Sequence, residues 1–176
     1  MKVNVHAIQA FLESQKMSCV SIPKSQELPF DQILLPLGVD EQGRDLVLGI
    51  KFIEEELSST QELFSLEKGM SKFFNIQFNY LLPFTIKDEY VGEVARLILL
   101  LNHSFGLPGF ELSEIDHAIY FRNVLLVGEE IEEMMVMMVI GNILANVDAF
   151  SSSIEAVATG KMSLTDVINA AQAETP

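Results

Sequence analysis

Four glutamates stand close together at residues 129–133, where the sequence reads EEIEE before a long apolar run. Carboxylates gathered in this way could hold a metal ion, as in di-iron proteins, but those sites also need a Glu-x-x-His motif. The apolar run that follows contains no histidine. The alternative is that Glu129, Glu130, Glu132 and Glu133 place negative charge at a helix N-terminus, which the helix dipole favours by roughly 0.3–1 kcal/mol per group. The pattern indicates this second role.

Three other side chains could bind a metal or act as nucleophiles, and these are His103, His117 and Cys19. Asp116 precedes His117, so two histidines and a carboxylate could hold zinc in principle, but their spacing matches no known ligand set. Histidines at a surface or a helix end are more common, and Cys19 lies in a strand-like segment where a buried, inert thiol is expected. The chain contains no G-x-S-x-G, Walker or G-x-G-x-x-G motif. We therefore expect a protein that is not an enzyme and that holds no metal and no cofactor.

A cluster of methionines follows the glutamates, with Met at 134, 135, 137 and 138. Methionine is flexible and is common on surfaces that bind several partners, although a core helix is the alternative. The cluster covers more than one face of a helix, which is wider than packing on one side requires. Gly141, Ala145 and Ala149 continue it as a stripe of small residues that permits close approach of another element. The residues expected to bind a partner are Met134, Met135, Met138, Gly141 and Ala145.

The apolar run could also be a membrane span. From Met134 to Ala145 only Gly141 and Asn142 interrupt it, which gives about a dozen residues where a spanning helix needs roughly 20. Its left flank carries four acids where lysine or arginine is typical. We expect a protein that is not integral to a membrane.

Composition narrows the classes of partner. The chain has 176 residues, 49% of them hydrophobic, and a net charge of -14, which repels phosphate backbones and excludes nucleic acid as an expected partner. Residues 101–176 carry 2 basic and 11 acidic side chains, a balance of -9. One cysteine permits no disulfide within the chain, and the first residues contain Glu13 where an export signal needs an apolar stretch. A cytoplasmic location is expected.

Runs of apolar residues, mostly alternating with polar ones, predict the strands. The expected strand segments are 18–23, 31–39, 44–53, 73–84 and the hairpin 110–127. Residues 40–43 are expected to form a turn, and Pro36 marks either a sheet edge or a bulge. Asn75, Gln77 and Asn79 alternate with large apolar residues, which indicates that one face of their strand is solvated.

Helices are expected where apolar residues recur every three or four positions. These segments are 5–12, 86–103, 129–150 and a last short helix after Ser163, with a further helical turn within 54–70. The expected N-caps and capping boxes are Asn4, Ser59 with Glu62, Thr85 with Asp88, and Ser163 with Asp166. The GLPG segment at 106–109 should end the second helix. Strands that come in hairpins predict an α+β fold with a mostly antiparallel sheet and helices at the N-terminus, middle and C-terminus, arranged as one domain over 1–150 with a helical tail over 151–176.

The segment LLLNHSFGLPGFELSEIDHAIYFRNVLLV, together with this order of elements, resembles the type III secretion chaperone-like fold, including its YbjN-like branch. In that fold a helix ending near an asparagine, here Asn102, leads to a hairpin, here 110–127, and then to a C-terminal helix. The resemblance extends at the level of pattern over residues 4–150. It implies a homodimer that holds an extended client segment on apolar patches.

Three functions follow as hypotheses. The first is a non-catalytic chaperone-like module that binds a protein client. The second is a YbjN-like regulatory or sensory protein that acts through folded partners, and the third is an enzyme of unrecognised type. A deep pocket with convergent polar groups would favour the enzyme, whereas long apolar surface grooves would favour the chaperone.

Overall fold

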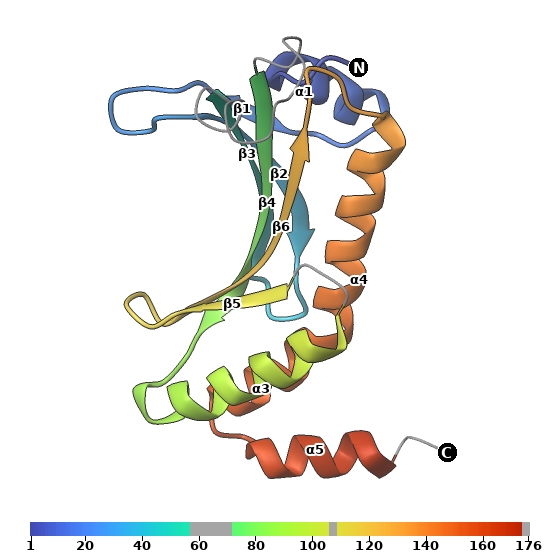
Figure 1. The fold of residues 1–176 in the computed structure, drawn as a ribbon. Helices are drawn as coiled ribbons and strands as arrows, with labels where there is room; N and C mark the ends of the chain where they lie inside the picture. The colour runs from blue at the N-terminus through green and yellow to red at the C-terminus, as the bar shows by residue number, and fades with distance from the viewer. Residues whose placement is uncertain (57–71, 106–108, 174–176) are drawn as a thin grey trace, which may run out of the picture. The chain divides into compact units, whose positions relative to one another are not determined.

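A computed structural model describes residues 1–56, 72–105 and 109–173 of the chain. In these residues the strands form a six-stranded antiparallel sheet with the order β1-β2-β3-β4-β6-β5 (Figure 1). The elements are α1 (Val5–Ser14), β1 (Val20–Ile22), β2 (Asp31–Val39), β3 (Asp45–Glu56), β4 (Lys72–Thr85), the 3-10 helix η1 (Asp88–Tyr90), α3 (Val91–Ser104), β5 (Gly109–Ser113), β6 (Ala118–Val127), α4 (Glu133–Ala158) and α5 (Leu164–Ala173). The predicted α+β class is confirmed. The predicted helical turn at Ser59 and Glu62 lies outside the described residues.

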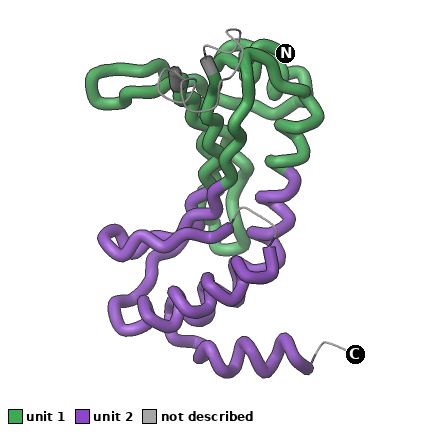
Figure 2. Tube along the Cα trace, viewed as in Figure 1, with its two compact units in different colours: residues 1–79, 123–140 green, residues 80–122, 141–176 purple. Residues whose placement is uncertain are grey.

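Two compact units make up the chain (Figure 2). Unit 1 contains residues 1–79 and 123–140, and unit 2 contains residues 80–122 and 141–176. The strands β4 and β6 and the helix α4 each pass from one unit to the other. The boundary expected at residue 150, between a body and a tail, lies inside α4.

The hairpin of β2 and β3 belongs to unit 1. Its register shifts between Pro36 and Gly38, so the proline marks a bulge in a strand that is paired on both sides. The turn that follows is the predicted one. Its Asp40 carboxylate accepts hydrogen bonds from the backbone of Gln42 and Arg44, both at 2.9 Å. The bond from the Arg44 backbone is the main cause that lowers the pKa of Asp40, and the Arg44 guanidinium acts in the same direction.

Unit 1 buries one face of its strands. The fully buried strand side chains in this unit are Ile33, Leu35, Leu48, Ile50, Ile76 and Phe78. Asn4 caps α1 as predicted, with its Oδ1 accepting a helix N–H at 2.9 Å, and Ile8 and Leu12 of that helix are completely buried. Val136 and Ile140 of α4 are buried as well. Because α1 and the first turns of α4 lie on the same side of the strands (Figure 1), they cover the apolar face that the alternation creates.

The start of α4 is fixed by residues near the other end of the sequence. The Val3 N–H donates to the Glu129 carbonyl at 2.9 Å, and the Ile131 N–H donates to the Met1 carbonyl at 2.9 Å. Lys2 and Glu130 form the antiparallel bridge between these bonds. The segment before α4 is therefore a short strand-like piece, and its position does not depend on α4 alone.

The predicted capping box of Thr85 and Asp88 is wrong. β4 continues through Thr85, and the next backbone N–H, that of Ile86, donates to the His117 carbonyl at 2.9 Å. The 3-10 helix η1 follows, and α3 begins at Val91 with no side-chain cap. A long-range backbone bond thus occupies the place where the local motif was expected.

The predicted end of the long helix near Phe150 is also wrong, because α4 continues to Ala158. The serines at 151–153 lie within the helix. Ile154 and Val157 follow them and are completely buried, so the apolar face of α4 continues past the serines.

The Asn102 side chain closes an edge of the sheet in unit 2. Its Nδ2 donates to the Phe110 carbonyl and its Oδ1 accepts the Phe110 N–H, both at 2.8 Å. A neighbouring strand would make the same pair of bonds, so the carboxamide takes the place of a peptide group beside β5. A Cβ added at Gly109 would overlap the Asn102 Oδ1, so a larger residue there would displace the carboxamide. α3 ends at Ser104, and residues 106–108 of the predicted GLPG stop lie outside the described residues.

Aromatic rings form a cluster in unit 2. The Phe110 and Phe121 rings meet edge to face with centroids 4.8 Å apart. Phe105 contacts both of them and also Phe150 of α4, with its centroid 5.5 Å from that of Phe150. Edge-to-face pairs of this kind add to the stabilisation from burial.

The capping box of Ser163 and Asp166 is confirmed at the start of α5. The Ser163 N–H donates to the Asp166 carboxylate at 2.9 Å, and the Asp166 N–H donates to the Ser163 Oγ at 3.2 Å. The hydrogen bonds from Ser163 lower the pKa of Asp166. The Glu93 carboxylate of α3 accepts the Leu164 N–H at 2.9 Å, which ties the start of α5 to α3.

The contact between Gly109 and Asn102 leads to a stability prediction. Gly109→Ala should lower the free energy of unfolding by about 1–3 kcal/mol, because the new Cβ displaces the carboxamide and leaves the Phe110 N–H and carbonyl without it. Gly92→Ala is the matched control, since a Cβ there meets nothing within 4 Å. It should be neutral or raise stability by up to about 1 kcal/mol. Urea denaturation of the variants checks both, and equal effects of the two changes would contradict the edge closure.

Candidate functional site

The helix α4 has a buried face and an exposed face. Val136, Val139, Ile140, Ile143 and Val147 are buried at helical spacing. The predicted partner-binding methionines lie between them on the other face, where the exposed fractions are 69% for Met134, 41% for Met135 and 66% for Met138. Large apolar side chains this exposed do not contribute to the core, so the sequence-based alternative of a wholly buried helix does not apply.

The small residues of the predicted site are exposed too. Gly141 and Ala145 are exposed, as is Ala149. A Cβ added at Gly141 would meet nothing within 4 Å. Within the described part of the chain, no other element therefore packs closely against Gly141.

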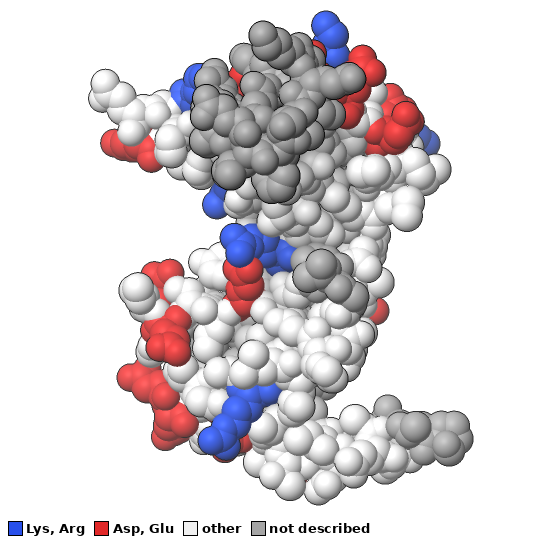
Figure 3. Space-filling view, viewed as in Figure 1, with Lys and Arg blue, Asp and Glu red and all other residues white. Residues whose placement is uncertain are grey.

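The four glutamates lie beside the methionines. Glu129, Glu130, Glu132 and Glu133 are all exposed, and only Glu133 lies in the first turn of α4. The dipole explanation therefore applies to fewer of them than the sequence indicated, because the pairing with residues 1–3 holds the segment before the helix extended. Acidic side chains gather over the connection from β6 to α4, and a mostly uncharged surface continues along α4 (Figure 3).

We call the group formed by these four glutamates with Met134 and Met138 the acidic–methionine surface. All six side chains belong to unit 1. None of the four glutamates forms an ion pair with a residue in the described part of the chain. Their charges are therefore available to a partner.

The length of α4 also bears on the membrane interpretation. Within the described residues, one helix, Glu133–Ala158, is long and apolar enough to cross a bilayer by length and composition alone. Its 26 residues rise about 39 Å, more than a hydrocarbon core of about 30 Å. The premise that the run is too short is therefore wrong. Core helices of globular proteins pass the same test, but those are mostly buried, whereas 28% of the apolar window of α4 is buried.

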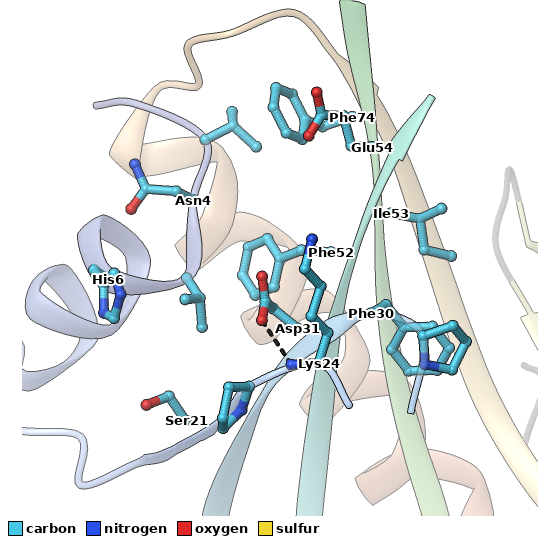
Figure 4. A pocket seen from close by; sticks show the side chains of 14 residues that line it. Asn4, His6, Ser21, Lys24, Phe30, Asp31, Phe52, Ile53, Glu54 and Phe74 are labelled. Atoms are coloured by element: carbon cyan, nitrogen blue, oxygen red, sulfur yellow. Dashed lines mark hydrogen bonds between the residues drawn. The ribbon is translucent and has the colours of Figure 1, made fainter. Parts of the chain in front are cut away.

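Unit 1 contains a pocket of about 1010 Å³ that the sequence did not predict (Figure 4). Aromatic side chains line it, together with charged and polar ones from α1, from the segment before β2 and from β3. The residues labelled in Figure 4 are Asn4, His6, Ser21, Lys24, Phe30, Asp31, Phe52, Ile53, Glu54 and Phe74. No signal in the sequence could have found it, because its lining comes from segments that only the fold brings together.

Two contacts engage charged groups in and beside the pocket. The Asp31 Oδ1 accepts the Lys24 backbone N–H at 2.8 Å, so this carboxylate closes the loop before β2. Lys51 lies over the Phe30 ring at 5.2 Å from its centroid. Both contacts stabilise the local structure around the pocket.

The other candidates for chemistry lie apart from one another. The His117 Nδ1 lies 3.1 Å from the Asp88 Oδ1, while Asp116 accepts the Ser113 hydroxyl at 2.9 Å. His103 is exposed at the end of α3. Burial, and then the charge of Glu13, raise the pKa of Cys19, which disfavours the thiolate. No group of three or more His, Cys, Asp or Glu in the described residues could hold a metal ion.

Comparison with known proteins gives no further assignment. No protein-family model matches the chain, and no curated protein matches its sequence. The surfaces described above are therefore the features of this chain that bear on its function.

Gly141→Ala tests whether the small-residue stripe is open. The open space beside Gly141 predicts that alanine raises the free energy of unfolding by about 0.5–1 kcal/mol, because glycine is a poor helix former. Urea denaturation at low protein concentration measures this. A loss of stability would mean that another element of the same chain approaches α4 at this position.

Proposed function

We propose that this chain is a non-catalytic protein-binding module, resembling a type III secretion chaperone in holding an extended segment of a client protein. The exposed methionines of α4 carry the proposal. Met134 and Met138 lie one turn apart and each exposes about two thirds of its surface. Flexible, polarizable side chains in such a position can adapt to client segments of different sequence.

Burial supplies a sufficient driving force for binding. Covering a large apolar side chain contributes roughly 1.5–3 kcal/mol, so two methionines and their neighbours outweigh a moderate ordering cost in the client. A client without fixed structure can place its apolar residues on this face. The acidic flank keeps the protein soluble while the face is uncovered.

The pocket supports a second candidate function, a module that binds a small ligand. Its volume of about 1010 Å³ is that of ligand-binding pockets, and Phe30, Phe52 and Phe74 give it an apolar lining. The enzyme hypothesis depends on this pocket as well. Because Asp31 is bonded to the Lys24 backbone, we place the chaperone-like function first.

Met134→Ser combined with Met138→Ser tests the client-binding role. The wild type should suppress aggregation of a test protein diluted from guanidinium, and the double variant should need roughly tenfold more protein for the same effect. Light scattering of the mixture measures this.

The matched control is Leu99→Ser combined with Leu100→Ser on α3, whose side chains are 70% and 50% exposed. This variant should retain the activity of the wild type. Equal losses in both double variants would mean that general surface hydrophobicity is responsible. Binding to folded partners with no effect on the denatured protein would favour the YbjN-like regulator.

A homodimer through α4 is part of the proposal. The exposed stripe of Gly141 and Ala145 permits a second helix to approach closely, and a two-fold dimer is the commonest assembly. Two chains at a net charge of -14 repel, but at physiological salt the screening length is about 8 Å. Asn142, Asn146 and Asp148 along the helix favour a protein interface over a bilayer.

Ala145→Glu should dissociate this dimer while leaving the circular-dichroism spectrum unchanged, because Ala145 is exposed. Light scattering in detergent-free buffer should give about 39 kDa (twice 19.6 kDa) for the wild type and 19.6 kDa for the variant. Ala170→Glu on α5 adds the same charge elsewhere and should stay dimeric. A mass of 19.6 kDa for the wild type at micromolar concentration would contradict the dimer. A wild type that stays in solution only with detergent would contradict the proposal that α4 forms a protein interface and does not lie in a membrane.

A further inference from the structure

We propose that the acidic–methionine surface selects client segments in which lysine or arginine alternates with apolar residues. The inference rests on the proposed function and adds the chemistry of the partner. It depends on the glutamates at 129–133, whereas the proposed function depends on the methionines. The two can therefore fail separately.

The backbone fixes the two kinds of side chain side by side. Glu132 and Glu133 immediately precede Met134, and Met138 follows one helical turn later, about 6 Å along the axis. Glu129 lies in the segment that is paired with residues 1–3 through hydrogen bonds of 2.9 Å. The acidic groups therefore do not move independently of the methionines, and a bound segment meets both.

Charge complementarity identifies the occupant. The four carboxylates are exposed and make no ion pair within the described residues. An uncharged apolar segment would gain only from the methionines. A segment with lysine or arginine next to its apolar residues gains from both, and its approach is accelerated by the net charge of -14.

A second copy of the chain does not fit on the same patch. Two-fold pairing of this surface with itself would bring the glutamates of one copy against those of the other, and like charges brought together disfavour such a complex. The stripe at Gly141 and Ala145 carries no charge of its own, so it remains the place for the homodimer. A partner of opposite charge is the occupant that the acidic–methionine surface favours.

Three fluorescent peptides of about 16 residues test the inference by anisotropy. They share the same apolar residues, with Lys, Gln or Glu between them. The Lys peptide should bind about tenfold more tightly than the Gln peptide at about 0.05 M salt, and this advantage should shrink as salt approaches about 0.5 M. The Glu peptide should bind most weakly.

Two pairs of substitutions assign the effect to residues. Glu132→Gln with Glu133→Gln should reduce the preference for the Lys peptide at least threefold, which corresponds to about 0.7 kcal/mol of binding free energy. The affinity for the Gln peptide should stay unchanged. Glu41→Gln with Glu114→Gln is the control, because both glutamates are exposed and the net charge changes from -14 to -12 in either case. The control should keep the full preference.

Each other outcome overturns the inference in a distinct way. Equal binding of the Lys and Gln peptides, both lost with Met134→Ser and Met138→Ser, leaves the proposed function intact and removes the selection for basic segments. Loss of preference in the control variant as well means that net charge alone attracts the Lys peptide. Sedimentation of the protein with phosphatidylcholine vesicles through the same methionines assigns the surface to lipid instead.

Discussion

The burial of one apolar sheet face governs the arrangement of unit 1. Alternation on β2, β3 and β4 places large side chains such as Ile33, Ile50 and Phe78 on one side, and all three are completely buried. An antiparallel sheet with one such face needs a cover, and here α1 and the first turns of α4 provide it. Only part of the circumference of α4 is used for this. The apolar residues that remain, above all Met134 and Met138, face outward because they lie on the side of α4 opposite to its buried residues.

The titratable groups are engaged mainly in local structure. Asp40 closes a turn, Asp31 closes a loop and Asp166 caps a helix, each by accepting backbone N–H bonds of 2.8–2.9 Å. At Asp40 and Asp166 these bonds lower the pKa of the carboxyl group, which makes both carboxylates poor general bases. The glutamates at 129–133 make no such bond within the described residues. Their exposed charges belong to the acidic–methionine surface.

The sequence predicted those elements whose signal is local. Strand alternation identified β2, β3 and β4, and the caps at Asn4 and Ser163 marked the starts of α1 and α5. The errors arose where distant residues compete with a local motif. Ile86 bonds to the His117 carbonyl, which removes the expected capping box at Thr85.

Tertiary contacts also decide the extent of α4 and of its surroundings. Ile154 and Val157 are buried behind the serines, so packing carries the helix through a segment that reads as a break. The exposed methionines were predicted because apolar residues on every side of a helix exceed what one contact can cover. The sequence did not predict the pocket or the pairing of Met1 with Ile131, because no periodicity connects residues so far apart.

The carboxamide that closes β5 gives the sheet edge a finite chemical lifetime. Asparagine side chains hydrolyse slowly to aspartate, which makes them among the thermolabile groups of proteins. At Asn102 this reaction would replace the Nδ2 donor with a second acceptor facing the Phe110 carbonyl, now 2.8 Å away. An attractive contact would become a repulsive one, a conversion that the mass of aged protein would record. The strand edge would then open as the molecule ages, and sooner at higher temperature, because the hydrolysis is thermally activated.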